Sequence, residues 1–200
     1  MLQHNCARSK EVMHSVLETA VKNADILLLQ EPWIGPKYTT VGHPTFVSIL
    51  PKDTPSRRPR VAIFYSRAFP RLAVNVRSDL IDDEDILALE VSTPQLETFT
   101  IFNVYNEQVD GRGPYTVERK LQDFSLPRRC LLAGDFNSHN TWWNSNIRGN
   151  RNDEVLVQLA TDNNMVLLNE PDEPTHYPAN GNTPSVLDLT FATPAMFDWI

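Results

Sequence analysis

Cysteine is scarce in this sequence: Cys6 and Cys130 are the only two among 200 residues. Two cysteines cannot supply a disulfide framework or a thiolate zinc cluster. Both lie beside apolar, strand-like runs, which predicts two buried, reduced thiols.

Long apolar runs are missing as well. The longest, residues 26–29, is far shorter than the roughly 20 residues that span a bilayer. The first twenty residues include several polar and charged side chains and no apolar core of signal-peptide length. We therefore expect a soluble, intracellular protein with no membrane partner.

Basic residues are outnumbered: 18 Lys and Arg stand against 25 Asp and Glu, giving a net charge of −7. This balance argues against a passive nucleic-acid binder that works through a basic field. It is compatible with an enzyme whose acidic residues hold metal ions at a phosphate. Repeats, low-complexity tracts and linkers are absent, so we expect a single domain over residues 1–200, acting as a monomer.

Helix-like and strand-like segments alternate along the chain. Ser9 can cap a helix whose apolar residues recur at helical spacing from Val12 to Val21. The run at 26–29 predicts a strand covered on both faces and ended by Pro32. Further predicted strands are 46–50, 61–65, 72–76, 86–91, 99–105, 130–133, 165–168 and 186–191, and further helices are 115–124 and one beginning at 152 or 153. This mixture indicates a layered α/β or α+β domain.

Two charged loops are less informative. The acidic segment 81–85 alternates the direction of its carboxylates, so we expect a solvated loop rather than a metal site. Arg57, Arg58 and Arg60 flank a proline-rich loop and could touch DNA phosphates. A solvated basic loop is the equal alternative.

Polar residues stand where several predicted strands end. They are Asn5, Glu31, Tyr105, Asn106, Asp135 and Asn137. Strand ends in layered α/β folds converge on one crevice, and residues two apart in an extended segment point the same way. Carboxylate and carboxamide oxygens suit Mg²⁺ or Mn²⁺. Taken singly, each feature has an ordinary alternative, since a strand-terminal Glu is often a cap and Gly-Asp is often a turn.

Three motifs appear in order: Leu-Gln-Glu-Pro-Trp at 29–33, Gly-Asp-Phe-Asn-Ser-His at 134–139, and Ser-Val-Leu-Asp-Leu-Thr-Phe at 185–191. Together they resemble the endonuclease/exonuclease/phosphatase superfamily, and within it the N-terminal endonuclease domain of non-LTR retrotransposon polyproteins. The resemblance runs from Gln3 to Asp188. The Gly-Asp-Phe-Asn block, followed by His139 and by Trp142-Trp143, favours the retroelement branch over phosphoinositide or sphingomyelin phosphatases.

The resemblance implies a four-layer α/β/β/α sandwich, two packed β-sheets flanked by helices. It also implies that Asn5 and Glu31 hold the divalent metal that neutralises the scissile phosphate. Asp135 would orient or deprotonate the attacking water, and Asn137 would hydrogen-bond the phosphoryl oxygen or the nucleophile.

Further roles follow from the same resemblance. Tyr105 would contact the phosphate through its hydroxyl, with Asn106 in support, and Asp188 would orient a catalytic histidine. We expect His139 to support the Asp135 loop. Trp142 and Trp143 could stack on DNA, although at least one should belong to the core.

The catalytic histidine is where the sequence departs from the family. The family supplies it in a Ser-Asp-His motif on a further strand, and no such motif follows Asp188. We therefore expect a domain truncated at its C-terminus, lacking that strand, with the apolar faces of Val186, Leu187 and Phe191 exposed and little or no activity of its own. A Tyr-x-Asp-Asp polymerase signature is also absent, so reverse transcription would belong to another domain of the full-length polyprotein.

The leading hypothesis is a Mg²⁺-dependent endonuclease domain that nicks DNA for retrotransposition and, if active, works in the nucleus. One alternative is a phosphatase or lipid phosphodiesterase of the same fold. The other is an inactive, truncated relic.

Overall fold

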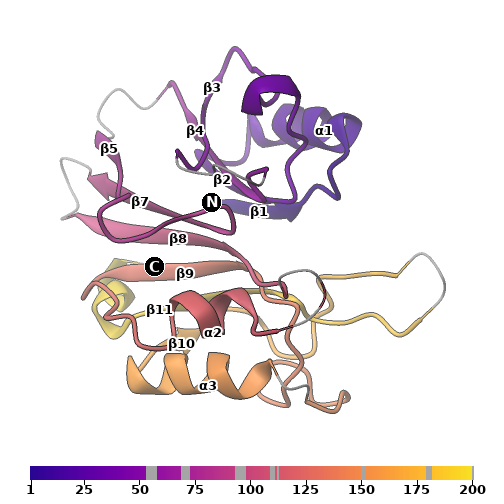
Figure 1. Cartoon of the computed structure of the whole chain (residues 1–200), viewed down its shortest axis with the longest axis vertical. Helices are drawn as coiled ribbons and strands as arrows, with labels where there is room; N and C mark the ends of the chain where they lie inside the picture. The colour runs from indigo at the N-terminus through magenta and orange to yellow at the C-terminus, as the bar shows by residue number, and fades with distance from the viewer. Residues whose placement is uncertain are drawn as a thin grey trace. The chain divides into compact units, whose positions relative to one another are not determined.

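The computed structural model describes residues 1–52, 58–68, 73–92, 98–108, 111, 113–149, 152–178 and 182–199. The chain divides into two compact units, Met1–Tyr105 and Asn106–Ile200, which are described in turn. Their colours run from indigo to magenta and on to yellow (Figure 1). Among the described residues, no helix combines the length and apolar character needed to cross a membrane.

The first unit begins with a β-α-β arrangement. Its elements are β1 (Leu2–Asn5), α1 (Lys10–Ala20), β2 (Ile26–Gln30), the short 3-10 helix η1 (Pro36–Tyr38), β3 (Phe46–Ile49) and β4 (Val61–Ser66). The four strands form one sheet in the order β1-β2-β4-β3, with only the β1–β2 pair parallel. The Ser9 hydroxyl accepts a hydrogen bond from Val12 N at 3.2 Å, which starts α1 as the sequence predicts.

Helix α1 covers one face of this sheet. Its buried residues Met13 and Leu17 share a hydrophobic cluster with Leu27 and Leu29 of β2. Since neighbouring strand residues point to opposite faces, Leu28 lies on the other face, and it is also fully buried. A second layer must therefore cover that face.

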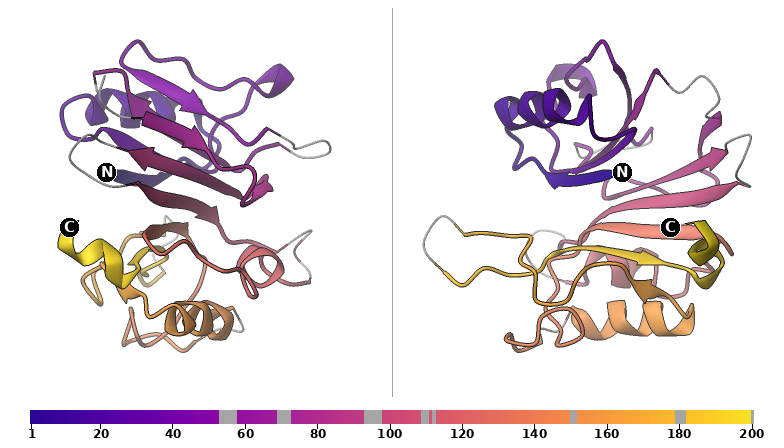
Figure 2. Two further views of the ribbon diagram at one scale, coloured as in Figure 1. Left: turned by 90° about the vertical axis from the view of Figure 1, so that its left-hand side faces the viewer. Right: turned by 180° about the vertical axis from the view of Figure 1, so that it is seen from behind.

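The second layer is an antiparallel sheet of the same unit. It comprises β5 (Ala73–Val76), β6 (Asp82–Asp83), β7 (Ile86–Ser92) and β8 (Phe99–Tyr105). Strand β7 lies between β5 and β8 and also pairs with β6. Strands β7 and β8 contact β2 and β4, so the unit is layered as helix, sheet, sheet (Figure 2).

The second unit has its own strands and helices. They are α2 (Thr116–Lys120), β9 (Cys130–Asp135), α3 (Asp153–Asp162), β10 (Val166–Leu167), β11 (Asp188–Ala192) and the 3-10 helix η3 (Pro194–Trp199). Strand β11 pairs antiparallel with both β9 and β10. Helices α2 and α3 lie side by side (Figures 1 and 2). Phe191 packs edge-to-face with Phe136 and Trp143, at centroid distances of 5.9 and 6.3 Å.

Most predicted elements are present, and three expectations about them need correction. Strand β9 extends through Asp135, and helix α2 is shorter than the predicted 115–124. The exposure expected for Val186 and Phe191 is wrong, because both are fully buried. Phe191 is held within β11, which has a neighbour on each side.

The cysteine prediction is confirmed. Cys6 and Cys130 are both free and buried. Burial raises the pKa of each thiol to about 12, because a thiolate would be poorly solvated there. Neither thiol is a nucleophile at neutral pH.

Candidate functional site

In the first unit, Asn5 and Glu31 lie at the same edge of the sheet. Strands β1 and β2 run parallel with Asn5 opposite Gln30, so the next residue of β2's path, Glu31, emerges beside the loop that follows Asn5. Two backbone bonds fix this corner: Cys6 N donates to Gln30 O, and Arg8 N donates to Glu31 O, each at 2.8 Å. The structure thus brings together the two residues predicted to hold a metal.

The Glu31 carboxylate has a cationic partner that sequence reasoning missed. Arg8 Nη2 lies 2.6 Å from Glu31 Oε1, and the exposed fractions of the two side chains are 66% and 18%. Asn5 Oδ1 accepts a hydrogen bond from Ala7 N at 2.8 Å. The only sequence signal for Arg8 was a basic residue shortly after Asn5.

The backbone at this corner is strained. Ala7, Arg8 and Glu31 have φ values of +46°, +58° and +42°, a region that side-chain-bearing residues seldom occupy. Each such residue costs on the order of 1–3 kcal/mol and persists where the surroundings impose it, often at functional sites. The donor atoms here are hard oxygens, and Arg8 is exposed enough to move away, so the corner fits a divalent metal such as Mg²⁺.

A buried ion pair lies next to this corner. The Arg60 guanidinium donates to both carboxylate oxygens of Asp85, and it lies over the Tyr105 ring, 5.2 Å from the centroid. Asp85 is fully buried, and Asp83 is only 5% exposed. The solvated loop expected for residues 81–85 is therefore wrong, because Arg60 neutralises Asp85 and β6 pairs with β7.

The arginines proposed for DNA contact separate into three cases. Arg57 lies outside the described residues. Arg58 is exposed, and its Nη1 reaches Ile34 O at a long 3.4 Å. The Arg60 side chain is only 16% exposed and is committed to Asp85, so its expected role as a DNA contact is corrected.

The acidic residues 83–85 were also considered as a metal site. Ligand atoms of Asp83, Glu84 and Asp85 lie within 4.8 Å of one another. The Asp85 carboxylate is already bound by Arg60, and Asp83 Oδ1 accepts a hydrogen bond from Asp85 N at 3.0 Å. These contacts make the group a structural feature of the turn.

In the second unit, the structure places Asp135 directly opposite Asp188. The two residues are partners in the antiparallel pairing of β9 with β11. Asp135 is 7% exposed, whereas Asp188 is half-buried and donates its backbone N–H to Thr175 Oγ1 at 2.9 Å. Like charges directly opposite each other on two strands are destabilising, which is typical of sites kept for function.

The loop after β9 is a turn and not the extended segment we expected. Asn137 has φ +47°, and its N–H donates to Asp135 Oδ1 at 3.1 Å. The same-side argument for the two side chains is therefore wrong, since it assumed extended backbone. The turn itself keeps Asn137 close to the Asp135 carboxylate.

Two buried asparagines hold this turn in place. Asn106 Nδ2 donates to Phe136 O at 2.9 Å and to Asn152 Oδ1 at 2.8 Å. Asn152 Nδ2 in turn donates to Phe136 O and Asn137 O. Asn137 Nδ2 donates to Asn106 O at 3.1 Å. Asn152 was missed as a site residue because its position before α3 suggested only a helix cap.

His139 and the two tryptophans flank the same turn. Burial lowers the pKa of His139, and the nearby Asp153 charge opposes this effect. Trp143 is fully buried and donates its indole N–H to Ser138 O at 3.1 Å, so its suggested DNA contact is corrected and the expectation of one core tryptophan is confirmed. Trp142 is 38% exposed.

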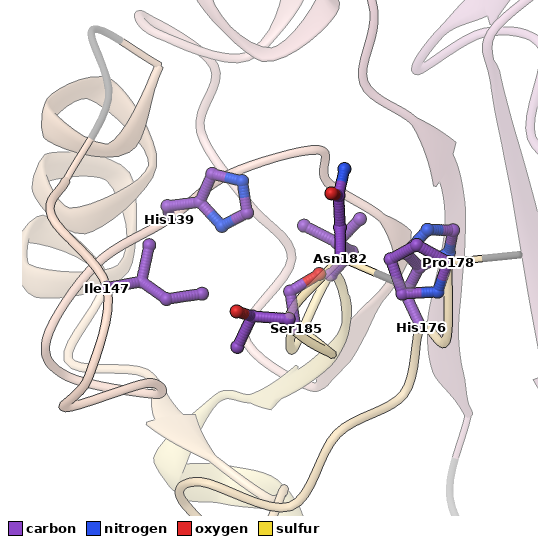
Figure 3. Close-up of a pocket in the computed structure, with 8 residues that line it drawn as sticks. His139, Ile147, His176, Pro178, Asn182 and Ser185 are labelled. Atoms are coloured by element: carbon purple, nitrogen blue, oxygen red, sulfur yellow. The ribbon is translucent and has the colours of Figure 1, made fainter. Parts of the chain in front are cut away.

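A pocket of about 630 Å³ opens beside this turn, entirely within the second unit (Figure 3). His139 and Ile147 line one side, His176 and Pro178 the other, with Ser185 between them. His176, expected in a loop, forms an isolated bridge with Ser185. The lining therefore combines imidazoles and hydroxyls with apolar surface.

Comparisons with known proteins agree with this picture. A family model described as endonuclease-reverse transcriptase matches residues 99–198, half of the chain. The endonuclease domain of TRAS1, a telomere-specific non-LTR retrotransposon, is similar in structure with a TM-score of 0.75 at 23% identity, over 98% of this chain and 86% of that one. A search of curated proteins finds no match.

Two more distant structures share the fold. The AP endonuclease LMAP from Leishmania major has a TM-score of 0.69 at 12% identity, covering 99% of this chain and 79% of its own. An endonuclease/exonuclease/phosphatase family protein from Leptotrichia buccalis has a TM-score of 0.53 at 10% identity, covering 96% and 86%. The predicted α/β sandwich class is confirmed by these similarities.

Proposed function

This chain belongs to the endonuclease-reverse transcriptase family, and from that premise we propose that it is a metal-dependent endonuclease domain that nicks DNA for a non-LTR retrotransposon. The observation that carries the proposal is the pairing of Asp135 with Asp188 across β9 and β11, inside the matched region. Asn137 is held against the same carboxylate by its own backbone N–H.

Asn5 and Glu31 would hold the metal. Their oxygens lie at one sheet edge, and the residue paired with Glu31 is an exposed arginine that can be displaced. Bound Mg²⁺ or Mn²⁺ supplies positive charge that neutralises the scissile phosphate.

The remaining residues take roles in moving protons and orienting the phosphate. Asp135 accepts a proton from water as the water oxygen bonds to phosphorus and one P–O ester bond breaks. Asn137 and the Tyr105 hydroxyl donate hydrogen bonds to phosphate oxygens as negative charge develops there. Asp188 orients a histidine that protonates the leaving oxygen, in the manner of a triad.

Conversion of supercoiled plasmid to the nicked form tests the proposal. We expect nicking with Mg²⁺ or Mn²⁺ and none with a chelator. Asp135→Asn should lower the rate by about 10²–10⁴-fold, the usual contribution of a general base. Asp123→Asn, an exposed aspartate of the same unit, is the matched control and should leave nicking unchanged. Phosphate release from small monoesters without plasmid nicking would favour a phosphatase instead.

The histidine is tested separately. No Ser-Asp-His motif follows Asp188 in the 200 residues, so the chain should be compared with the same chain joined to a segment that carries this motif. We expect the added histidine to raise the nicking rate by about 10²–10⁴-fold. Equal rates for the two forms would contradict the role given to Asp188.

DNA binding should rest on a few local contacts, because the chain carries a net charge of −7. Affinity is expected to fall steeply with salt, and replacing Arg57 and Arg58 by alanine should make the salt dependence shallower by about one per lost phosphate contact. Metal affinity should not change. In the full-length polyprotein, a reverse transcriptase domain would be the partner, and the nucleus the place of action.

A further inference from the structure

Arg60 and Asp85 form a tightly matched pair inside the first unit. Arg60 Nε donates to Asp85 Oδ1, and Arg60 Nη2 donates to Oδ2, the two-pronged geometry in which arginine binds a carboxylate most strongly. The Asp85 side chain is fully buried, and that of Arg60 is 16% exposed. A pair this deeply buried is a weak source of stability, because desolvation offsets the attraction. Its retention therefore invites a second explanation.

The pair engages Tyr105 in two ways. The Arg60 guanidinium covers one face of the phenol ring, 5.2 Å from the centroid. The backbone carbonyl of Asp85 accepts a hydrogen bond from Tyr105 N at 2.8 Å. One residue of the pair thus fixes the ring of Tyr105, and the other fixes its backbone.

The same pair also reaches Glu31. The carbonyl of Arg60 accepts the N–H of Glu31 at 2.8 Å, and Arg60 N donates to Glu84 O at 2.7 Å. Glu31 has a left-handed backbone, with φ +42°, which neighbouring bonds must impose. Arg60 is therefore bonded through its backbone to Glu31 and stacked through its side chain on Tyr105.

We infer that the Arg60–Asp85 pair is a positioning unit that sets the phenol of Tyr105 and the backbone of Glu31 for the cleavage reaction. The inference rests on the proposed function, which assigns Tyr105 to the phosphate and Glu31 to the metal. Arg60 and Asp85 themselves do not touch substrate. Misplacing a reacting group by about 1 Å can cost on the order of 10²-fold in rate, so a device that fixes two such groups is worth its burial.

A double-mutant cycle tests this inference. Arg60→Met combined with Asp85→Leu removes both charges together, which avoids leaving one buried and unpaired. In this background and in the wild type, the cost of Tyr105→Phe is measured by plasmid nicking. The wild-type sequence is used with and without the Ser-Asp-His extension, and the faster form carries the comparison.

We expect the paired substitution to lower kcat by about 10–10²-fold with KM nearly unchanged. Tyr105→Phe should then cost little more, because the hydroxyl is already misplaced. The matched control is Arg77→Met with Glu90→Leu, which removes a 2.7 Å ion pair elsewhere in the same unit. It should leave both nicking and the cost of Tyr105→Phe at their wild-type values.

A readout independent of activity separates the possible failures. In protein labelled with 3-fluorotyrosine, Tyr105→Phe identifies the Tyr105 fluorine resonance among those of the five tyrosines. We expect that resonance to shift in the Arg60 and Asp85 double variant and not in the Arg77 control. Should the double variant not fold, Arg60→Lys, which keeps the charge and loses the planar stack, is expected to give a smaller loss of the same kind.

Each outcome bears on one claim. A folded double variant that nicks like the wild type, or an equal cost of Tyr105→Phe in both backgrounds, overturns the positioning role and leaves the proposed function intact. A wild-type chain that nicks in neither form overturns the proposed function, and the role of the pair in cleavage with it, even if the fluorine resonance shifts.

Discussion

Gln30 Nε2 donates a hydrogen bond to Asn103 Oδ1 at 2.6 Å, and this contact joins the two sheets of the first unit through their interior. Both side chains are fully buried. Asn103 Nδ2 extends the link by donating to Leu29 O at 3.1 Å and Ala62 O at 2.9 Å. One asparagine of β8 therefore bonds to both β2 and β4.

Asn103→Leu should destabilise the protein because it removes three hydrogen bonds from a buried site and leaves the Gln30 amide without this acceptor. We expect the free energy of unfolding to fall by at least about 1–3 kcal/mol, the cost of an unsatisfied buried polar group. Urea unfolding measures it. Asn23→Ala, whose amide bonds to Thr19 O on the surface, is the control and should change stability by less than about 0.5 kcal/mol.

Arg8→Met should tighten metal binding, because it removes the cation that bonds to the Glu31 carboxylate. A largely exposed ion pair contributes about 0.2–1 kcal/mol, which corresponds to a gain of roughly 1.4- to 5-fold in Mn²⁺ affinity. Titration calorimetry or the loss of the free Mn²⁺ paramagnetic resonance signal reports it. Weaker Mn²⁺ binding by the variant would show that Arg8 supports the site rather than competing with the metal.

Asn152→Ala should loosen the turn that carries Asn137, since two backbone carbonyls and the Asn106 amide lose their partner. A loss of about 1–3 kcal/mol in unfolding free energy is expected, together with slower nicking. Asn163→Ala provides the comparison at the other end of α3, where the side chain bonds only to Leu159 O. It should reduce stability slightly and leave nicking at the wild-type rate.

Trp142 and Trp143 should respond differently to alanine. Trp143→Ala empties a fully buried site and is expected to lower the unfolding free energy by about 3–5 kcal/mol. Trp142→Ala should be milder in unfolding and should weaken binding to a DNA oligonucleotide by about 1–3 kcal/mol if a base stacks on the exposed indole. Unchanged DNA affinity would remove Trp142 from the interface.

His139 should make stability depend on pH in the acid range. Burial lowers its pKa in the folded protein below the ordinary value of about 6.5, so the unfolded chain binds a proton that the folded chain refuses. Stability should be insensitive to this group above about pH 6.5 and should fall as the pH drops from there towards the folded value. Urea midpoints of wild type and His139→Gln between pH 7.5 and 5 measure this part, and parallel curves would contradict it.

Much of the fold follows from local patterns in the sequence. The strands at Ile26–Gln30 and Phe99–Tyr105 are continuous apolar runs, and the Ser9 cap precedes a clear helical period. Glu31 and Asn5 could be placed together because each ends such a run. Motif order supplied the roles of Asp135 and Asp188, and the structure adds that they are paired across two strands.

The parts that could not be predicted depend on contacts between distant residues. Asp85 is buried because Arg60, 25 positions earlier, neutralises it, and no periodicity in the acidic segment reveals that partner. Asn137 leaves the extended conformation because Asn106 and Asn152 bond to its turn. Trp143 is distinguished from Trp142 by packing against Phe191, a residue of another strand.

The parallel pairing of β1 with β2 has a consequence for the order in which the chain folds. Leu2 and Leu27 are 25 positions apart, whereas Asp135 and Asp188 are 53 apart, and the intervening α1 has its own cap. Closing the longer loop costs about 0.6 kcal/mol more in chain entropy, since each doubling of length adds that amount. We therefore expect the β1-α1-β2 segment to form early and β9–β11 later, so that substitutions at Leu17 slow refolding while those at Leu189 mainly speed unfolding. The corner that carries Asn5 and Glu31 would then be built before the strands that carry the two aspartates have paired.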